Sequence, residues 1–527
     1  MAQHTLSVED QVSDILRALP ARISDVLLPW AERSPDRPAL LEASRTWTCG
    51  HLASAVAATR LLLRNSGVRA GDRVMLIGEN SPVFVAMLFA AAGLDAWPVL
   101  VNPRLSTREV DAIRDHCVAR RVIYIPSASP QAREHAAHHG AAGAEVAGLG
   151  PVLLGPLNEA ANPEPLDPNI SNRIAALIYT SGTTGRPKGV MLTHRGLLFV
   201  AAISARLRSL GPDDRLYGVL PMFHAVGLSV VLLGALLSGA AVYLAPRFDP
   251  VAALAALESA RITVMLGAPA MFALMVEYAK SKGIPSLKFP ALRIISSSSA
   301  PLHAPLKSGV EKLFGLVLHN GYGATECSPN IAQTRVESPR ADISVGRVFP
   351  GTEISLVGTD GNPVPEGEVG ELRVRGPSVM KGYYRAPKET AEAVDASGWF
   401  HTRDLARLDQ GNLFIVGRAK ELIVRFGFNV YPAEVEAVLN AHPGVVRSAV
   451  IGRTIEGQGN EEVLAFIQLA PGASVTTNEL AAYAAKQLAP YKQPSQFIVV
   501  PVMPMTATGK IVKAELAKMA ADATRRS

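Results

Sequence analysis

The segment from 179 to 189 carries the densest set of groups that could bind an anion. It reads YTSGTTGRPKG, so four small hydroxyl residues, three glycines and one lysine occupy eleven positions. Glycines let backbone amides approach a polyanion, hydroxyls donate hydrogen bonds, and a lysine supplies positive charge. This composition predicts a phosphate-binding loop rather than a plain surface turn.

The loop differs from the phosphate loop in which Gly-Lys-Ser/Thr opens a helix. Pro187 precedes Lys188 and Gly189 follows it, and apolar residues 175–178 and 190–192 flank the loop. These flanks predict two strands joined by the loop. A helix dipole is therefore not expected to hold the phosphate.

Further segments with defined polar residues follow along the chain. They read YGATE at 322–326, GWFHTRD at 398–404, GRAKE at 417–421 with Gly427 after it, and PMTATGK at 504–510. In this order, the five segments resemble the motifs of the adenylate-forming superfamily, which includes acyl-CoA and aryl-CoA ligases, peptide-synthetase adenylation domains and firefly-type luciferases. Arg403 stands where that superfamily usually has a glycine. Residues 1–150 match only loosely.

The resemblance implies two half-reactions. A carboxylate first attacks the α-phosphorus of Mg-ATP and gives an acyl-adenylate and pyrophosphate. A thiol then attacks the acyl carbon, and AMP leaves. Because two anions meet in the first step, cations and oriented donors are the main physical requirement. The implied cofactors are ATP, Mg²⁺ and coenzyme A as co-substrate, and the partner molecule is a small carboxylic acid.

The resemblance also implies roles for single residues. Lys510 bridges the substrate carboxylate and the α-phosphate, Thr325 donates to the α-phosphate, and Glu326 ligates Mg²⁺, a cation that prefers oxygen ligands. Serines stand at 298 and 299, where glycines are common in the superfamily. The other expected ATP contacts are Thr180, Ser181, Gly182, Thr183, Thr184 and Lys188 for the phosphates, Ser298, Ser299, Ala300, Tyr322 and Gly323 around adenine, and Asp404 and Arg418 at the ribose.

Lys510 must lie near the α-phosphate in the first half-reaction and away from it in the second. A small domain on a flexible joint meets this requirement. Lys420 occupies the implied hinge position, and Gly427 is expected to line the channel for the pantetheine arm. The expected domains are an N-terminal adenylation domain at 1–417, a hinge at 418–421 and a C-terminal cap domain at 422–527 that carries the catalytic lysine.

Residues 221–224, PMFH, bear on the substrate. Relatives that activate amino acids usually place an aspartate after the phenylalanine to pair with the substrate amine, and His224 stands there instead. An amino acid substrate is therefore disfavoured. In acyl-CoA and aryl-CoA ligases this position gates the thiol channel, which is the role expected of His224. The expected acyl pocket consists of Ala225, Val226, Gly227, Gly267, Ala268, Gly321, Gly323, Cys327 and Ser328.

This pocket is apolar and built of small residues, so it offers no cation for a second carboxylate. Gly321 is expected to leave the pocket floor open. Cys327 is expected to be a wall residue, because the covalent intermediate is on AMP and no protein nucleophile is required. A medium- or long-chain fatty acid is the expected substrate, and an aryl or phenylpropanoid acid is the alternative.

The expected activity is that of an ATP-dependent acyl-CoA ligase, an AMP-forming acid–thiol ligase. One alternative is an acyl-AMP ligase that loads a carrier protein acting in trans. A luciferase-like oxygenase and a non-catalytic nucleotide-binding protein are also compatible with parts of the pattern. Lys510, Glu326 and Asp404 occur together, which argues against the non-catalytic alternative.

Alternating segments predict the fold. A strand at 72–77, a helix capped by Ser81 and a strand at 97–101 form a βαβ unit, which indicates a mostly parallel sheet covered by helices. Short strands separated by turns follow residue 340, and a small α+β block follows residue 418. The expected class is α/β, with a large multi-subdomain N-terminal domain of mixed and parallel sheets, a β-rich subdomain, and a small mobile α+β C-terminal domain.

His135, His138 and His139 lie at helical spacing within 125–165, a stretch rich in Ala, Gly and Pro that is predicted to form a variable surface region. Three histidines on one face could hold a metal ion. No acid or cysteine completes a ligand set, so an exposed polar helix face is the favoured interpretation.

Length and composition limit the classes of protein to which the chain can belong. The chain has 527 residues, whereas a single hydrophobic core stops growing near roughly 250–300, so two or more domains are expected. Apolar residues make up 48% and charged residues 19%, which excludes a disordered chain. The net charge is +6, but no run of five basic residues occurs, so no nucleic-acid partner is expected.

The same composition bears on the compartment and on membrane association. The three cysteines are widely spaced, which excludes a disulfide framework and predicts a reducing, cytoplasmic location. The first thirty residues show no signal peptide. Residues 225–245 are uncharged, but their glycines favour a buried helix at 228–237 and a strand at 241–244, so no transmembrane segment is expected. A homodimer is compatible with the sequence.

Overall fold

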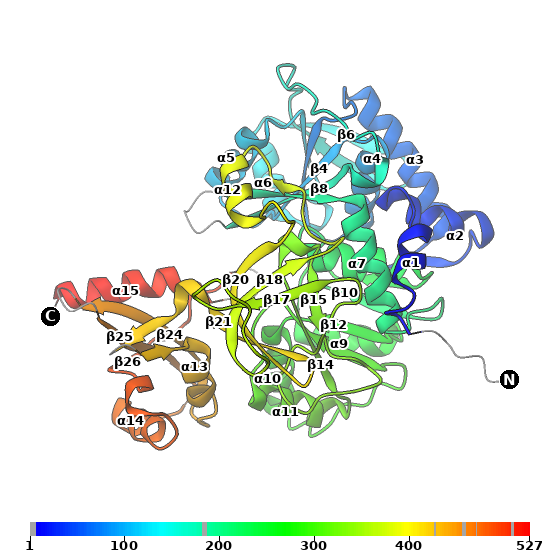
Figure 1. Ribbon diagram of the computed structural model, residues 1–527. Helices are drawn as coiled ribbons and strands as arrows, with labels where there is room; N and C mark the ends of the chain where they lie inside the picture. The colour runs from blue at the N-terminus through cyan, green and yellow to red at the C-terminus, as the bar shows by residue number, and fades with distance from the viewer. Residues whose placement is uncertain are drawn as a thin grey trace.

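The computed structural model describes residues 7–181, 187–425, 428–455, 460–470, 472–506 and 511–526 (Figure 1). Two large sheets, of nine and eight strands, form most of the N-terminal part, and a four-stranded sheet follows them. The C-terminal elements lie to one side of this body, in orange and red in Figure 1. The expected α/β class is confirmed, with a large N-terminal part, a β-rich unit and a small C-terminal α+β unit.

The eight-stranded sheet carries both strands that flank the phosphate loop. Its central strands pair in parallel, as the βαβ pattern predicted, and the pair beside the loop is antiparallel. In spatial order the strands are β19 (Gly382–Tyr383), β9 (Pro187–Thr193), β8 (Ile174–Ser181), β4 (Trp97–Val101), β3 (Arg73–Ile77), β5 (Arg121–Tyr124), β7 (Gly150–Leu154) and β6 (Ala142–Val146).

The nine-stranded sheet supplies the segments expected around adenine and the acyl group. Its middle is parallel, and its ends are antiparallel. The order is β16 (Arg347–Val348), β15 (Asn330–Gln333), β14 (Leu318–Gly323), β13 (Ile294–Ser297), β12 (Val264–Gly267), β10 (Arg215–Gly218), β11 (Ala241–Leu244), β1 (Pro38–Leu41) and β2 (Thr46–Thr48).

Helices pack against both sheets. One hydrophobic cluster contains residues of both sheets together with α4 and α7, so the sheets share a core. Helix α4 is apolar on every side and buried, and Ser81 caps it by accepting the Phe84 amide, as the sequence predicted. The helices before residue 400 are α1 (Val12–Ala18), α2 (Leu28–Arg33), α3 (Cys49–Asn65), α4 (Pro82–Gly93), α5 (Thr107–Cys117), α6 (Pro130–His138), α7 (His194–Leu207), α8 (Gly234–Leu237), α9 (Pro250–Ser259), α10 (Pro269–Ser281), α11 (Ala304–Phe314) and α12 (Pro387–Ala393).

The β-rich unit and the C-terminal unit follow. The first is an antiparallel sheet of β17 (Glu353–Val357), β18 (Val369–Arg375), β20 (Phe400–Asp409) and β21 (Asn412–Arg418). The second combines the hairpin β22 (Ile423–Arg425) and β23 (Phe428–Val430), the sheet β24 (Val445–Ile455), β25 (Asn460–Leu469) and β26 (Gln496–Val499), and the helices α13 (Pro432–Asn440), α14 (Thr477–Ala485) and α15 (Lys513–Arg526).

Two stretches differ from the sequence expectation in detail. The predicted variable region at 125–165 contains α6, β6 and β7, because its apolar residues complete the edge of the eight-stranded sheet. The predicted buried helix at 228–237 begins as a π-helix, Val226–Leu233, and continues as α8. Among the described residues, no helix has the length and apolar character needed to cross a membrane.

Candidate active site

The strands β8 and β9 bring the two ends of the phosphate loop together. Thr180 lies opposite Lys188, and Tyr179 lies opposite Gly189. A Cβ at Gly189 would lie 3.0 Å from the Tyr179 ring, so the absence of a side chain at Gly189 lets this ring pack against the backbone of β9. Ser181 ends β8. The predicted loop residues Gly182, Thr183 and Thr184 lie outside the described residues.

One tyrosine connects the phosphate loop to the expected metal ligand. Strand β19 pairs with β9, which places the Tyr383 ring beside the loop, 5.0 Å from the Lys188 ammonium. The Tyr383 hydroxyl donates a 2.9 Å hydrogen bond to Glu326 Oε1. Burial and the Glu326 charge raise the pKa of Tyr383, so its hydroxyl stays protonated and remains a donor.

Sequence reasoning missed Tyr383. Tyr383 lies in none of the five segments, and the surrounding residues Lys381 and Tyr384 carry no motif that indicates a binding site. Its significance depends on β19 joining the edge of the sheet beside β9, which is a long-range pairing.

The segment 322–328 turns sharply after β14. Thr325, Glu326 and Cys327 form a 3₁₀ turn, and a Cβ at Gly323 would lie 1.8 Å from the Pro329 carbonyl oxygen. Only glycine fits at 323, which holds Thr325 and Glu326 at the strand end. Burial, with Glu326 nearby, raises the pKa of the Cys327 thiol well above its usual range, so this cysteine is poorly suited to act as a nucleophile.

Three of the predicted ATP contacts meet between two sheets. The Tyr322 hydroxyl donates to Asp404 Oδ2 at 2.5 Å, and Arg418 Nε donates to Asp404 Oδ1 at 3.1 Å. Asp404 and Arg418 face each other across β20 and β21, whereas Tyr322 comes from β14. The segments YGATE, GWFHTRD and GRAKE therefore converge on one carboxylate.

Two positions where the superfamily usually has glycine adopt left-handed backbone. Ser299 has φ 73° and Arg403 has φ 60°. This conformation costs a side-chain-bearing residue about 1–2 kcal/mol and a glycine almost nothing. Both positions thus keep the left-handed backbone that favours glycine, although a serine and an arginine occupy them.

Arg403→Gly is expected to raise the free energy of unfolding by about 1 kcal/mol, because it relieves this backbone strain. The exposed Arg403 side chain makes a 3.3 Å hydrogen bond to the Glu392 carbonyl and a long, 3.8 Å ion pair with Glu371, whose side chain is largely buried. Urea unfolding measures the change. Arg403→Ala is the control: an equal gain in that variant would show that the Arg403 side chain, not the backbone, is the cause.

The acyl and adenine segments lie next to each other. The Ser298 amide donates to the Gly267 carbonyl at 3.1 Å, and Ala268 caps α10. Within the described part of the chain, the buried Ser298 hydroxyl has no hydrogen-bond partner, so it is available to a ligand. Ser299 is exposed, and Ala300 is half-buried.

His224 lies two residues before the π-helix that begins at Val226. Burial, with Arg104 nearby, lowers its pKa to about 4, so the imidazole is neutral near pH 7. Its Nε2 is buried without a hydrogen-bond partner among the described residues. A π-turn of this kind is frequent at functional sites. These features agree with a side chain that faces a ligand channel.

The small residues of the predicted acyl pocket differ in what surrounds them. A Cβ at Gly227 would lie 2.2 Å from the Pro221 carbonyl oxygen, so close backbone packing requires that glycine. A Cβ at Gly267 would lie 3.1 Å from Phe272, and one at Gly321 would lie 3.5 Å from the nearest atom. Ala225 and Ser328 are buried, and Val226 is half-buried.

The expected hinge is a short turn. Ala419, Lys420 and Glu421 form a 3₁₀ turn with Lys420 exposed. Lys513 ties the turn to the C-terminal unit through Glu421 at 3.0 Å and Glu436 at 2.8 Å. The predicted residues Gly427 and Lys510 lie outside the described residues.

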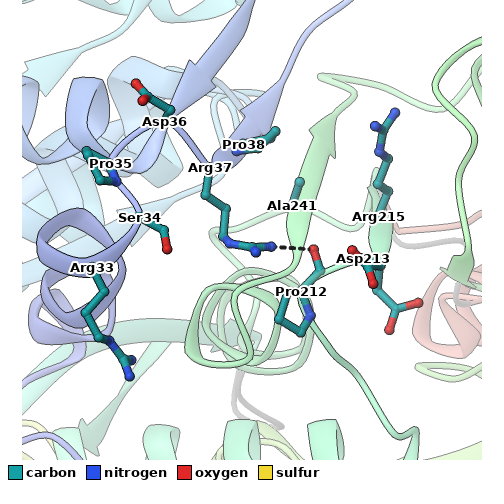
Figure 2. A pocket seen from close by; sticks show the side chains of 11 residues that line it. Arg33, Ser34, Pro35, Asp36, Arg37, Pro38, Pro212, Asp213, Arg215 and Ala241 are labelled. Carbon is teal, nitrogen blue, oxygen red and sulfur yellow. Dashed lines mark hydrogen bonds between the residues drawn. The ribbon is translucent and has the colours of Figure 1, made fainter.

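An open cavity of about 550 Å³ lies elsewhere, where the start of β1 meets the starts of β10 and β11 (Figure 2). Figure 2 shows Arg37 reaching Pro212 across it. None of its lining residues belongs to the five segments. It is therefore not the ATP site.

Comparison with known proteins agrees with the motifs. The model of the AMP-binding enzyme family matches residues 28–384, and that of the AMP-binding enzyme C-terminal domain matches residues 434–510. Feruloyl-CoA synthase of Amycolatopsis sp is 36% identical over 92% of this chain and 96% of that protein. Indoleacetate–CoA ligase of Aromatoleum aromaticum is 33% identical over 94% of this chain and 99% of that protein.

Solved structures show the same fold. The anthranilate CoA ligase AuaEII, in complex with anthranoyl-AMP, has a TM-score of 0.83 and 25% identity, covering 97% of this chain and 98% of its own. ATP-bound MatB from Rhodopseudomonas palustris has a TM-score of 0.82 and 28% identity, covering 95% and 98%.

The fold and the converging motifs define an adenylate-forming enzyme. The chain belongs to the AMP-binding enzyme family. It is an ATP-dependent acid–CoA ligase, for which ATP, Mg²⁺ and coenzyme A are the cofactor set. The groups present are compatible with that set: the Lys188 ammonium lies 5.0 Å from the centroid of the Tyr383 ring, and the Glu326 carboxylate lies 2.9 Å from the hydroxyl of the same residue, so a cation and a metal-ligating carboxylate lie near each other.

Proposed function

We propose that this ligase activates an aromatic carboxylic acid of the phenylpropanoid or arylacetic type and transfers the acyl group to coenzyme A. The observation that carries the proposal is the 36% identity to feruloyl-CoA synthase over nearly the full length of both chains. This likeness favours the alternative raised from sequence over the fatty acid that was first expected. The small, uncharged acyl segments are compatible with a planar ring.

In the first half-reaction, Lys188 and the loop hydroxyls would hold the phosphates, and Glu326 would ligate Mg²⁺, which supplies neutralisation of phosphate charge when bound. Asp404 accepts the ribose hydroxyls. The Asp404 carboxylate already accepts hydrogen bonds from Tyr322 and Arg418. Its two oxygens offer about four acceptor positions, so it can accept further hydrogen bonds from the ribose hydroxyls. Thr325 and Lys510 stabilise charge at the α-phosphate.

In the second half-reaction, His224 and Gly427 border the thiol channel, and rotation about Lys420 withdraws Lys510. We assign the domains as 1–417, the hinge as 418–421 and the cap as 422–527. The hydrophobic clusters support this division, since the buried residues of the N-terminal clusters end at Leu413 and those of the C-terminal clusters begin at Ile423. The three buried, unpaired cysteines support a reducing, cytoplasmic compartment.

A panel of acids tests the substrate class. Ferulate, 4-coumarate, indoleacetate, octanoate and palmitate are each supplied with ATP and Mg²⁺, with and without coenzyme A, and AMP and pyrophosphate are measured. The best aromatic acid is expected to exceed both fatty acids in kcat/KM by about 10-fold or more. A preference for palmitate or octanoate would overturn the aromatic assignment.

The same panel separates the acceptors. Continuous AMP release is expected only with coenzyme A. If pyrophosphate appears in a single turnover and coenzyme A does not stimulate further AMP release, the acceptor is instead a carrier protein, the remaining alternative.

Tyr383→Phe is expected to raise the Mg²⁺ concentration for half-maximal adenylation by about 10-fold, because Glu326 loses the donor that orients it. The ring that faces Lys188 is kept, so the KM for ATP at saturating Mg²⁺ should change little. Tyr384→Phe is a matched control, since the neighbouring hydroxyl bonds Glu164 instead. A Mg²⁺ titration that is the same for both variants would refute the positioning role of Tyr383.

A further inference from the structure

A cluster of metal-ligating side chains that belongs to none of the five segments lies beside the end of β5. Asp111 comes from α5, His138 is the last residue of α6, and His139 caps that helix. One ligand atom of each residue lies within 4.8 Å of the others. None of the three residues has a role in the ligase reaction proposed above.

The cluster corrects the interpretation drawn from sequence. His135 does not share an exposed face with the other two histidines, because it is buried and its Nε2 lies 3.1 Å from the carbonyl oxygens of Pro103 and Leu105. Asp111 is the acid that was missing, and it reaches the histidines from another helix. Local spacing could not reveal it.

The central ligand of the cluster is already oriented. His139 Nε2 lies 2.8 Å from Asp111 Oδ1, and the Tyr124 hydroxyl lies 2.5 Å from His139 Nδ1. Metal-binding histidines commonly use one ring nitrogen for the ion and the other for a hydrogen bond that fixes the ring. Tyr124 is placed to make that hydrogen bond. The His138 ring is exposed, and its centroid lies 5.1 Å from that of His139.

We propose that Asp111, His138 and His139 form a binding site for a divalent transition-metal ion of the Zn²⁺ type. Two imidazoles and one carboxylate suit Zn²⁺, Co²⁺ and related ions, with a water molecule in the fourth position. Mg²⁺ prefers an all-oxygen octahedral shell, so the site does not compete for the ion that accompanies ATP.

Binding requires a small local rearrangement. The ion replaces the hydrogen bond between His139 Nε2 and Asp111, and His139 then carries its proton on Nδ1 and donates to the Tyr124 oxygen. Arg114 also pairs with Asp111, at 2.8 Å, but it pairs with Asp115 at 2.9 Å as well. Asp115 can therefore retain the Arg114 charge while Asp111 binds the ion. The ion would link α5 to the end of α6.

Cobalt provides a direct readout on the intact, untagged protein. The chain is stripped of metal with a chelator and titrated with Co²⁺ while the visible ligand-field absorption is recorded. We expect one equivalent of Co²⁺ to give the bands of a four- or five-coordinate site, and one equivalent of Zn²⁺ to abolish them. Asp111→Asn and His138→Ala are each expected to weaken binding by about 10-fold or more.

His51→Ala is the matched control, because His51 is an exposed histidine on α3 outside the cluster. It is expected to bind Co²⁺ like the unaltered chain. His138 is itself exposed, so His138→Ala tests the site even if Asp111→Asn fails to fold. Undetectable binding at 1 mM Co²⁺, or unchanged binding in both cluster variants, would overturn the site. Because none of these readouts depends on AMP release, the outcome is separate from that of the proposed ligase substrate.

Discussion

Lys510→Ala is expected to lower ATP–pyrophosphate exchange by about 10²–10³-fold, because the two anions of the first half-reaction lose the cation that the proposed mechanism places between them. Synthetic acyl-adenylate supplied to the same variant should still be converted to the thioester at nearly the rate of the unaltered enzyme. The two half-reactions are measured separately, by exchange of labelled pyrophosphate and by thioester formation from the adenylate.

Lys486→Ala is the control for loss of positive charge in the C-terminal unit. Lys486 is an exposed lysine that caps the C-terminal end of α14, and its removal should leave both half-reactions unchanged. An equal loss of both half-reactions in Lys510→Ala would refute the assigned role, since it would indicate a general structural defect.

Lys420→Pro is expected to have the opposite effect: adenylation is retained, and thioester formation falls by about 10²-fold, as for a misplaced reacting group. Proline fixes φ near −65°, a value compatible with the 3₁₀ turn at 419–421. The hydrogen bond that closes the turn runs from the Leu422 amide to the Ala419 carbonyl and does not use the Lys420 amide. Proline therefore costs no hydrogen bond at 420, and by fixing φ there and restricting the backbone of Ala419 it hinders rotation about the hinge.

The contacts of the C-terminal unit support this reasoning. Asn440 on α13 donates to the His303 ring at 3.3 Å, a link that crosses between the two units and that rotation would break. Lys420→Ala keeps the backbone free and is expected to support both half-reactions. Normal thioester output from Lys420→Pro would remove the hinge assignment.

Much of the local structure was predictable. The strand predicted at 97–101 is β4, and the predicted cap Ser81 begins α4. Both predictions rest on residues close in sequence, where β-branched runs and a capping hydroxyl act within one element. The π-helix after His224 was not predicted, because its apolar residues are equally compatible with an α-helix.

In the site, too, the local features were predictable and the long-range contacts were not. The residue types needed for phosphate, ribose and metal binding were identified from five short segments, because each segment carries its chemistry locally. Their convergence was implied by resemblance, but the contacts that join them were not. Tyr383 reaches Glu326 across 57 residues, and Tyr322 reaches Asp404 across 82.

The class of chemistry and the order of the elements follow from the amino-acid sequence alone, since both depend on residue types and on spacing within single strands, helices and loops. The contacts of Tyr383 with both Lys188 and Glu326, and that of Asp111 with His139 from 28 residues away, arise only when the chain is folded. The physical reason is that such meetings depend on strand register and on how helices pack over a sheet, and neither is encoded in the spacing of neighbouring residues.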